Sequence, residues 1–136
     1  MTKPNFGRLT IASMILLTGV ALGAGASGAE PVNIEGRWSG GGTVSFASGS
    51  NEKARCNVTY RRNSAYSYSA SAVCATASGR VAQTARLSRS SDTTFEGSFH
   101  NSEYGVSGSV YISVRGGTQY VKLSSDSGSA SLKLSR

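Results

Sequence analysis

The 136-residue sequence predicts an all-β protein, an eight-stranded antiparallel up-and-down barrel. Three observations support this prediction. Apolar and polar residues alternate with a period of two in a series of short segments, as expected for strands with one buried face. Residues that favour turns, mainly Gly, Ser, Asn and Asp, separate these segments. Both prolines precede the first segment, and the Leu, Glu and Lys content typical of a helical protein is missing.

Residues 1–29 have the features of a secretory signal peptide. Lys3 and Arg8 precede an apolar run, which ends in small residues. We expect cleavage after Ala26 or Ala29, which leaves residues 30–136 as a single domain in the second case. A membrane-anchoring helix is the alternative, but small residues interrupt the apolar run and no basic cluster follows it.

The first predicted strand covers residues 34–46. Its even-numbered positions carry apolar or small side chains, among them Trp38, the single tryptophan. Gly36 and Gly40 flank Trp38 in phase and leave space for the indole at one end of a small barrel. The Gly40–Gly42 run lacks the lysine of a phosphate-binding loop, and we interpret it as a bulge or a bend.

Segments 54–61 and 66–74 predict a hairpin with a turn at 62–65. In this register Cys56 lies opposite Cys74, and both side chains point inward. These are the two cysteines of the chain, and export would place them in an oxidising compartment. The sequence therefore predicts one disulfide between neighbouring strands.

The same phase places three tyrosines of this hairpin inside the barrel: Tyr60, Tyr66 and Tyr68. We interpret them as core and rim residues. The alternative is that tyrosines at a barrel mouth line a site for a small molecule.

The remaining predicted strands cover residues 80–87, 95–99, 104–114, 119–123 and 130–136. A two-residue turn at Asn101–Ser102 would place Phe99 opposite Tyr104. Gly116–Gly117 and Asp126–Ser127 supply the next two turns. Because the outward positions are mostly polar, we expect a soluble barrel filled with side chains, and not an outer-membrane barrel with an apolar exterior.

The first and last strands resemble a known family pattern. Gly36-Arg37-Trp38 and the in-phase Arg136 resemble the signature of the calycin superfamily, in which a last-strand guanidinium packs over the indole. Within the calycins, the chain length, the leader and the two cysteines after Trp38 are most similar to bacterial metalloprotease inhibitors of the Inh type and related envelope domains. The resemblance implies a calycin-like barrel.

The Inh-type resemblance also implies that a short N-terminal trunk, starting with Ser, enters the protease cleft. Cleavage after Ala26 would give a trunk that starts at Ser27, whereas cleavage after Ala29 would start the chain at Glu30. The second case leaves little trunk to insert.

Strand phase supports a contact between Trp38 and Arg136. Both residues are in phase with the inward residues of their strands, and closure of the barrel makes those strands neighbours. We predict that the guanidinium stacks on the indole as the closing contact of the barrel.

We predict no enzymatic activity, no cofactor and no metal site. His100 is the single histidine; its phase points outward, beside the predicted turn and opposite Glu103. A solvated turn pair explains it better than a general base, because no nucleophile is placed with it. The cysteines are better used in a disulfide than as metal ligands.

The chain is basic, with a formal net charge of +7. Loss of Lys3 and Arg8 with the leader leaves twelve basic and seven acidic residues. Six cations form a candidate basic patch at outward positions of the first four strands: Arg37, Lys53, Arg55, Arg61, Arg80 and Arg86.

Two functions follow from these predictions. The first is an exported, periplasmic or secreted, β-barrel binding protein that acts as an Inh-type protease inhibitor. The second is an envelope-associated module that binds an anionic glycan, lipopolysaccharide or a small ligand and inhibits nothing. We expect no nucleic-acid partner and no membrane span in the mature chain.

Overall fold

The computed structural model describes residues 30–136, which form one closed barrel of eight antiparallel strands. Each strand pairs with its neighbours in the sequence, and the first strand also pairs with the last. This confirms the predicted fold class. The predicted signal peptide and its cleavage positions lie outside the described residues. The strands are β1 (Gly36–Phe46), β2 (Asn51–Arg62), β3 (Ser67–Thr76), β4 (Gly79–Arg89), β5 (Thr94–Asn101), β6 (Val106–Arg115), β7 (Thr118–Ser125) and β8 (Gly128–Ser135).

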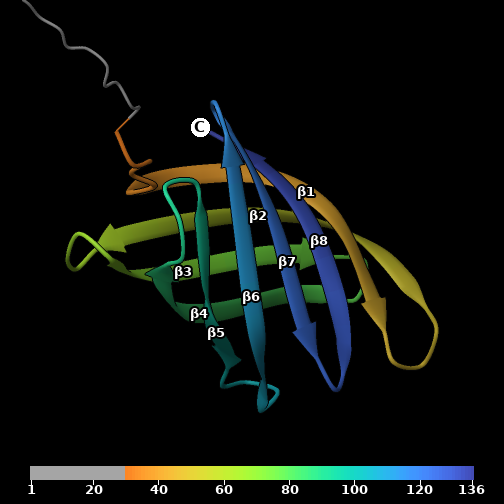
Figure 1. Cartoon of the computed structure of the whole chain (residues 1–136). Coiled ribbons are helices and arrows are strands. Elements are labelled where there is room, and N and C mark those ends of the chain that lie inside the picture. The colour runs from red at the N-terminus through yellow and green to blue at the C-terminus, as the bar shows by residue number, and fades with distance from the viewer. Residues whose placement is uncertain (1–29) are drawn as a thin grey trace, which may run out of the picture.

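Strand β1 bends so that it can pair with β2 and β8 at once. In Figure 1, β1–β4 run across the view behind β5–β8, and β1 curves from one set toward the other. Gly40 and Gly42 permit the bend: a Cβ on them would lie 2.1 Å and 1.8 Å from the carbonyl oxygens of Lys133 and Ser131. The pairing with β2 continues through both glycines without an extra residue, so of the two predicted alternatives, a bulge or a bend, the run is a bend.

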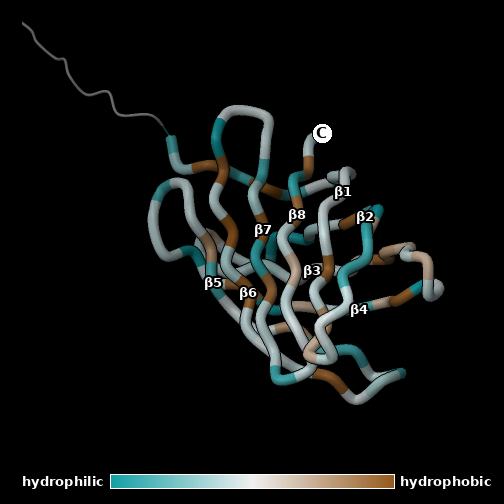
Figure 2. Tube along the Cα trace, turned by 90° about the vertical axis from the view of Figure 1, so that its right-hand side faces the viewer, coloured by the Kyte–Doolittle hydropathy of each residue, from teal (hydrophilic) through white to brown (hydrophobic). Residues whose placement is uncertain are grey.

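The alternation of side chains along the strands separates the core from the exterior. Figure 2 shows hydrophobic positions alternating with hydrophilic or neutral ones along the strands. The largest fully buried apolar side chains belong to Trp38, Tyr68, Phe95, Ile34, Ile112 and Leu134. Burial of one large apolar side chain stabilises a fold by roughly 1.5 to 3 kcal/mol. These residues therefore form the part of the core that holds the barrel closed.

The turn between β5 and β6 differs from the predicted two-residue turn. Four residues, 102–105, form it, and Phe99 lies opposite Gly108 instead of Tyr104. Gly105 has a φ of 64°, a left-handed conformation that glycine adopts without steric cost. This glycine ends the turn and leaves Tyr104 exposed at the barrel rim.

The loop between β2 and β3 also differs from the prediction. Strand β3 begins at Ser67, so Tyr66 belongs to the loop, where its backbone N–H donates to the Ser64 hydroxyl. Tyr66 is 68% exposed, and its predicted inward position is wrong. The turns at Gly116–Gly117 and Asp126–Ser127 are confirmed.

Candidate functional site

One end of the barrel is closed by residues 32–35, which we call the N-terminal strap. All four backbone carbonyls of the strap accept hydrogen bonds from side chains. Arg89 donates to the Val32 carbonyl at 2.7 Å, and the Trp38 indole N–H donates to the Ile34 carbonyl at 2.9 Å. Arg136 donates to the carbonyls of Asn33 and Glu35, at 3.1 Å and 3.0 Å. Ile34, within the strap, is completely buried. The strap is thus fixed to the barrel and closes this end.

Two arginines of the closed end each stack on a buried aromatic ring. The guanidinium carbon of Arg136 lies 4.5 Å from the centre of the Trp38 ring, at the contact expected from strand phase. The guanidinium carbon of Arg89 lies 4.8 Å from the centre of the Phe95 ring. Arg89 was not among the predicted site residues, although it follows Leu87 at the inward phase of β4.

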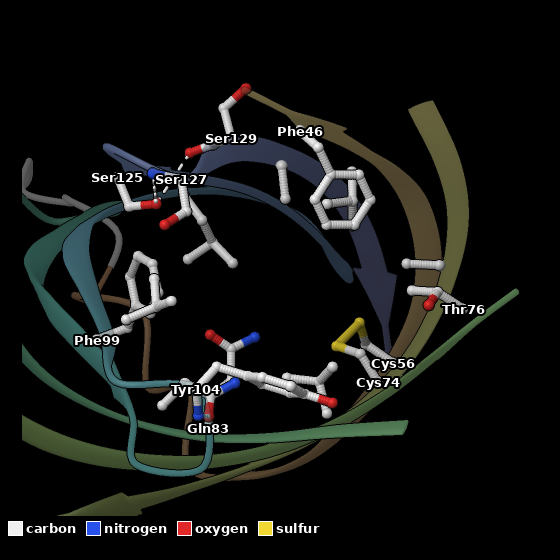
Figure 3. A pocket seen from close by; sticks show the side chains of 18 of the residues that line it. Phe46, Cys56, Cys74, Thr76, Gln83, Phe99, Tyr104, Ser125, Ser127 and Ser129 are labelled. Atoms are coloured by element: carbon white, nitrogen blue, oxygen red, sulfur yellow. Dashed lines mark hydrogen bonds between the residues drawn. A yellow bond between two sulfur atoms is a disulfide. The ribbon is translucent and has the colours of Figure 1, made fainter. Parts of the chain in front are cut away.

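The opposite end of the barrel is open and contains the mouth cavity, with a volume of about 330 Å³. In Figure 3, Phe46 and Phe99 lie on opposite sides of the opening, and the Cys56–Cys74 disulfide lies on the wall. Five aliphatic side chains that point into the cavity remain only half-buried: Val44, Val81, Val106, Leu123 and Ala130. Cavities of this size with mostly apolar walls are typical of small-molecule sites.

The mouth cavity exists because small side chains occupy inward positions near the open end. Ala54 and Ala130 line the cavity at positions where larger side chains would fill it. Ser125 on β7 and Thr76 on β3 also occupy inward positions of the lining and are small. The predicted filled interior is therefore wrong for this half of the barrel. The alternation of residues shows which side chains point inward, but the summed volume of those side chains decides whether they fill the interior.

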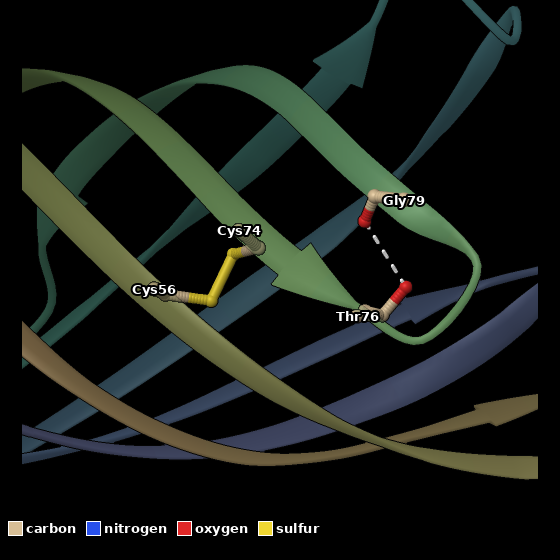
Figure 4. Close-up of a disulfide and its surroundings, with 4 residues drawn as sticks. All are labelled: Cys56, Cys74, Thr76 and Gly79. Carbon is tan, nitrogen blue, oxygen red and sulfur yellow. Dashed lines mark hydrogen bonds between the residues drawn. A yellow bond between two sulfur atoms is a disulfide. The ribbon is translucent and has the colours of Figure 1, made fainter.

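A disulfide fixes the wall of the mouth cavity. Cys56 and Cys74 are joined, with their Cα atoms 4.1 Å apart, and they pair directly across β2 and β3. Figure 4 shows the bond crossing between the two strands near the turn that follows Thr76. The predicted disulfide and the predicted register of this hairpin are confirmed. The bond holds β2 and β3 together at the cavity, where little packed core is present to do so.

Polar side chains line the mouth cavity beside the aliphatic ones, and several of them are committed to hydrogen bonds of the rim. Asn101 is 4% exposed, and its side-chain oxygen accepts from the Tyr104 N–H, so this carbonyl is committed to the rim turn. Thr76 is committed to its own turn, where it donates to the Gly79 carbonyl. The Gln83 amide also lines the cavity, and an amide carries both donors and an acceptor. Hydroxyl side chains also line the cavity, on Ser78, Tyr104, Ser125, Ser127 and Ser129, and those of Ser78 and Ser125 are committed to Glu52 and to the Gly128 carbonyl. Gln83 therefore stands out because its amide offers donors and an acceptor together.

A buried polar pair lies between β2 and β7. The Tyr60 hydroxyl donates to the side-chain oxygen of Gln119. Gln119 is completely buried. The Gln119 Nε2 atom has no hydrogen-bond partner within residues 30–136. Burial raises the pKa of the Tyr60 hydroxyl far above its usual range.

His100 lies outside the mouth cavity, on the outer wall. It is exposed, and its Nδ1 atom lies 2.7 Å from the Ser107 hydroxyl oxygen. The predicted position opposite Glu103 is wrong, because the longer β5–β6 turn places His100 opposite Ser107. Within residues 30–136, no three His, Cys, Asp or Glu side chains converge as metal ligands. The same stretch has no helix of the length and apolarity needed to cross a membrane.

The six cations of the predicted basic patch are exposed but occupy separate rows of the outer wall. Arg55 and Arg80 each lie opposite Ala75, and Arg61 and Arg86 each lie opposite Ser69. The other two, Arg37 and Lys53, pair with Thr59 and Thr43 across β1 and β2. The structure therefore gathers pairs of arginines, not one patch.

The chain folds as a β-barrel whose sheet closes on itself and whose interior opens to solvent at one end. No protein-family model matches the sequence, and no curated protein is significantly similar to it. It is similar in structure to a redesigned β-barrel, mFAP1, bound to DFHBI, with a TM-score of 0.65 and 14% identity over 76% of this chain and 94% of that chain. It is also similar to a de novo designed fluorescence-activating β-barrel, with a TM-score of 0.59 and 16% identity over 76% and 93% of the two chains.

These matches support the eight-stranded barrel fold. They are designed proteins of low sequence identity, so they carry no evidence for the resemblance to Inh-type inhibitors.

Proposed function

We propose that this protein is an exported binding protein that holds a small, mainly apolar molecule in the mouth cavity. The observation that carries the proposal is the cavity of about 330 Å³, whose aliphatic walls remain half-exposed at the open end of a closed barrel. Burying such surface under a ligand is favourable by about 25 cal/mol per Å². The Gln83 amide would bind a polar group of the ligand.

Two features support the proposal. The disulfide rigidifies the cavity wall, and a preformed cavity loses less free energy to ordering when a ligand binds. The similar designed barrels mFAP1 and mFAP0 are both bound to DFHBI, and so this fold accommodates a small molecule in those proteins. Export is favoured by the disulfide, which persists in oxidising compartments, and by the signal-like leader.

Filling the cavity tests the proposal. The Ala130→Leu variant adds apolar volume at a cavity-lining position between Val44 and Leu123. We expect it to fold and to lose most of the fluorescence enhancement that the wild type produces with an uncharged apolar reporter dye such as N-phenyl-1-naphthylamine. Ala82→Leu is the matched control, because it makes the same change at an exposed, outward position of β4. Equal dye binding by both variants would reject the cavity as the site.

Protease inhibition stays a prediction of the family resemblance. The strap fixes residues 32–35 to the closed end, so an inserted trunk would consist of residues before Val32. N-terminal sequencing of the mature protein gives the length of that segment. A panel of secreted metalloproteases, assayed with the wild type and with a chain that starts at Val32, then tests whether any inhibition depends on it.

A further inference from the structure

The outer wall of the barrel is strongly basic, and binding in the mouth cavity does not explain this. Among the outward-facing strand positions of residues 30–136, Glu96 is the one carboxylate. The other carboxylates lie outside the strands, except Glu52, which is held at the rim by Ser78. Nine cations occupy exposed outward positions: Arg37, Lys53, Arg55, Arg61, Arg80, Arg86, Arg115, Lys122 and Lys133.

Two of these cations lie in a groove on the outer face of β2–β5, with a volume of about 500 Å³. Arg61 on β2 and Arg86 on β4 both pair with Ser69 on the strand between them. Neighbouring strands are about 4.8 Å apart, so the backbones of the two arginines are roughly 10 Å apart across the groove. His100 lines the same groove on β5.

The rest of the groove lining consists mainly of hydroxyl groups and contains no carboxylate. The hydroxyls belong to Thr59, Ser69, Ser71, Thr84 and Ser98. Outside the lining, Arg37 pairs with Thr59, and Glu96 lies two residues before Ser98 on β5. A guanidinium binds a carboxylate or a sulfate through two parallel hydrogen bonds. Hydroxyl groups can exchange hydrogen bonds with the hydroxyls of a sugar.

The lining favours an acidic glycan over a nucleic acid. Binding of single-stranded nucleic acid typically uses exposed aromatic rings on which bases stack. The one Phe, Tyr or Trp in the lining is Phe99, which is only 8% exposed because its side chain points into the barrel. We propose that the groove between Arg61 and Arg86 binds an acidic oligosaccharide through its carboxylate or sulfate groups, at a site separate from the mouth cavity.

A matched pair of double variants tests this site in the full-length mature protein. Arg61→Gln/Arg86→Gln removes the two groove charges. Arg55→Gln/Arg80→Gln removes the same two charges from the same two strands, with the same spacing across β3, but outside the groove. All four side chains are exposed, so both variants should keep the wild-type unfolding midpoint. The probes are a sulfated heparin octasaccharide, a polygalacturonate oligomer, an uncharged dextran oligomer and a single-stranded oligonucleotide.

Isothermal titration calorimetry gives the dissociation constants at about 50 and about 200 mM salt. We expect the groove variant to bind one or both acidic glycans at least about tenfold more weakly than the wild type, and the control variant to change binding less than about threefold. Dextran should not bind. Equal weakening by both variants would show that only overall charge matters and would overturn the site. Equally tight binding of the oligonucleotide, or no binding of either glycan, would overturn the assignment to acidic glycans.

Discussion

The guanidinium carbon of Arg136 lies 4.5 Å from the centre of the Trp38 ring, and it joins the last residue of the chain to the first strand. The same guanidinium donates to the carbonyls of Asn33 and Glu35, at 3.1 Å and 3.0 Å. The Trp38 indole N–H donates to the carbonyl of Ile34 between them, at 2.9 Å. One arginine and one tryptophan thus fix three successive carbonyls of the strap.

Mutation of this pair should reveal their coupling. Trp38→Ala should lower the free energy of unfolding by about 3 to 5 kcal/mol, because it empties the volume of a buried indole. Arg136→Ala should cost less, about 1 to 3 kcal/mol, since it removes an exposed stacking contact and two hydrogen bonds. Chemical denaturation of both single variants and the double variant measures the coupling energy. We expect a coupling of at least about 0.5 kcal/mol.

Arg136→Lys is the matched control for that cycle. It keeps the positive charge but loses the planar fork that reaches two carbonyls at once. We expect it to be nearly as destabilised as Arg136→Ala. If the losses in the free energy of unfolding at Trp38 and Arg136 simply add, the stacking contact contributes nothing to stability. Arg136 would then no longer support the resemblance to the calycin signature.

The disulfide should contribute a large part of the stability near the mouth cavity. It closes a loop with a sequence separation of 18, for which chain entropy predicts about 3 kcal/mol. The Cys56→Ala/Cys74→Ala variant should therefore unfold at a lower denaturant concentration, by an amount that corresponds to about that free energy. The wild type treated with a thiol reductant should show the same loss. An unfolding midpoint that reductant does not change would contradict the prediction.

The strand pattern was predictable where two independent signals agreed. Alternation and cysteine spacing together gave the β2–β3 register, in which Cys56 lies opposite Cys74 and Tyr60 opposite Ala70. The β5–β6 register was missed, because Asn101–Ser102 and Gly105 are both turn signals and alternation alone does not choose between them. A shift by an even number of residues keeps every side chain on its predicted face.

The mouth cavity and the groove were less predictable than the fold. Inward alanines such as Ala54 and Ala130 agree equally well with a packed core and with an empty one, because packing depends on the residues opposite them. The pairing of Arg61 with Arg86 across Ser69 needs the registers of three strands at once. Arg89 was hidden for another reason. Its inward phase looks unfavourable for a charge until Phe95 and the strap carbonyl are in place.

Alanine at Gly42 should disrupt the bend of β1. A Cβ at this position would lie 1.8 Å from the carbonyl oxygen of Ser131, which belongs to the backbone of the paired strand. Because a backbone carbonyl cannot move aside without breaking the β1–β8 ladder, we expect Gly42→Ala to cost about 3 kcal/mol or more, or to prevent folding. The unfolding midpoint measured by Trp38 fluorescence gives the cost.

Gly117→Ala is the control for the bend. Gly117 lies in the β6–β7 turn, and a Cβ there would meet nothing within 4 Å. We expect a change within about 0.5 kcal/mol, as for other surface substitutions. If the two glycine variants were equally stable, β1 would not depend on the close approach at Gly42.

The last prediction concerns the buried pair of Tyr60 and Gln119. Tyr60→Phe removes the hydroxyl that donates to the Gln119 oxygen and leaves the whole buried amide without a partner. We expect a loss of about 1 to 3 kcal/mol in the free energy of unfolding. The Tyr60→Phe/Gln119→Leu variant should recover part of that loss, since it removes both polar groups together. A double variant that is less stable than Tyr60→Phe would contradict this view of the pair.

Alkaline pH gives an independent measure of the same pair. Burial raises the pKa of the Tyr60 hydroxyl in the folded state above its unfolded value of about 10. The folded state therefore keeps the proton that the unfolded state releases. The stability that the Tyr60 hydroxyl contributes should be fully present below about pH 10 and be lost as the pH rises above that value. Tyr60→Phe should lose less stability over the same range in pH-dependent denaturation. Parallel curves for the wild type and the variant would mean that Tyr60 titrates normally and that water reaches its hydroxyl.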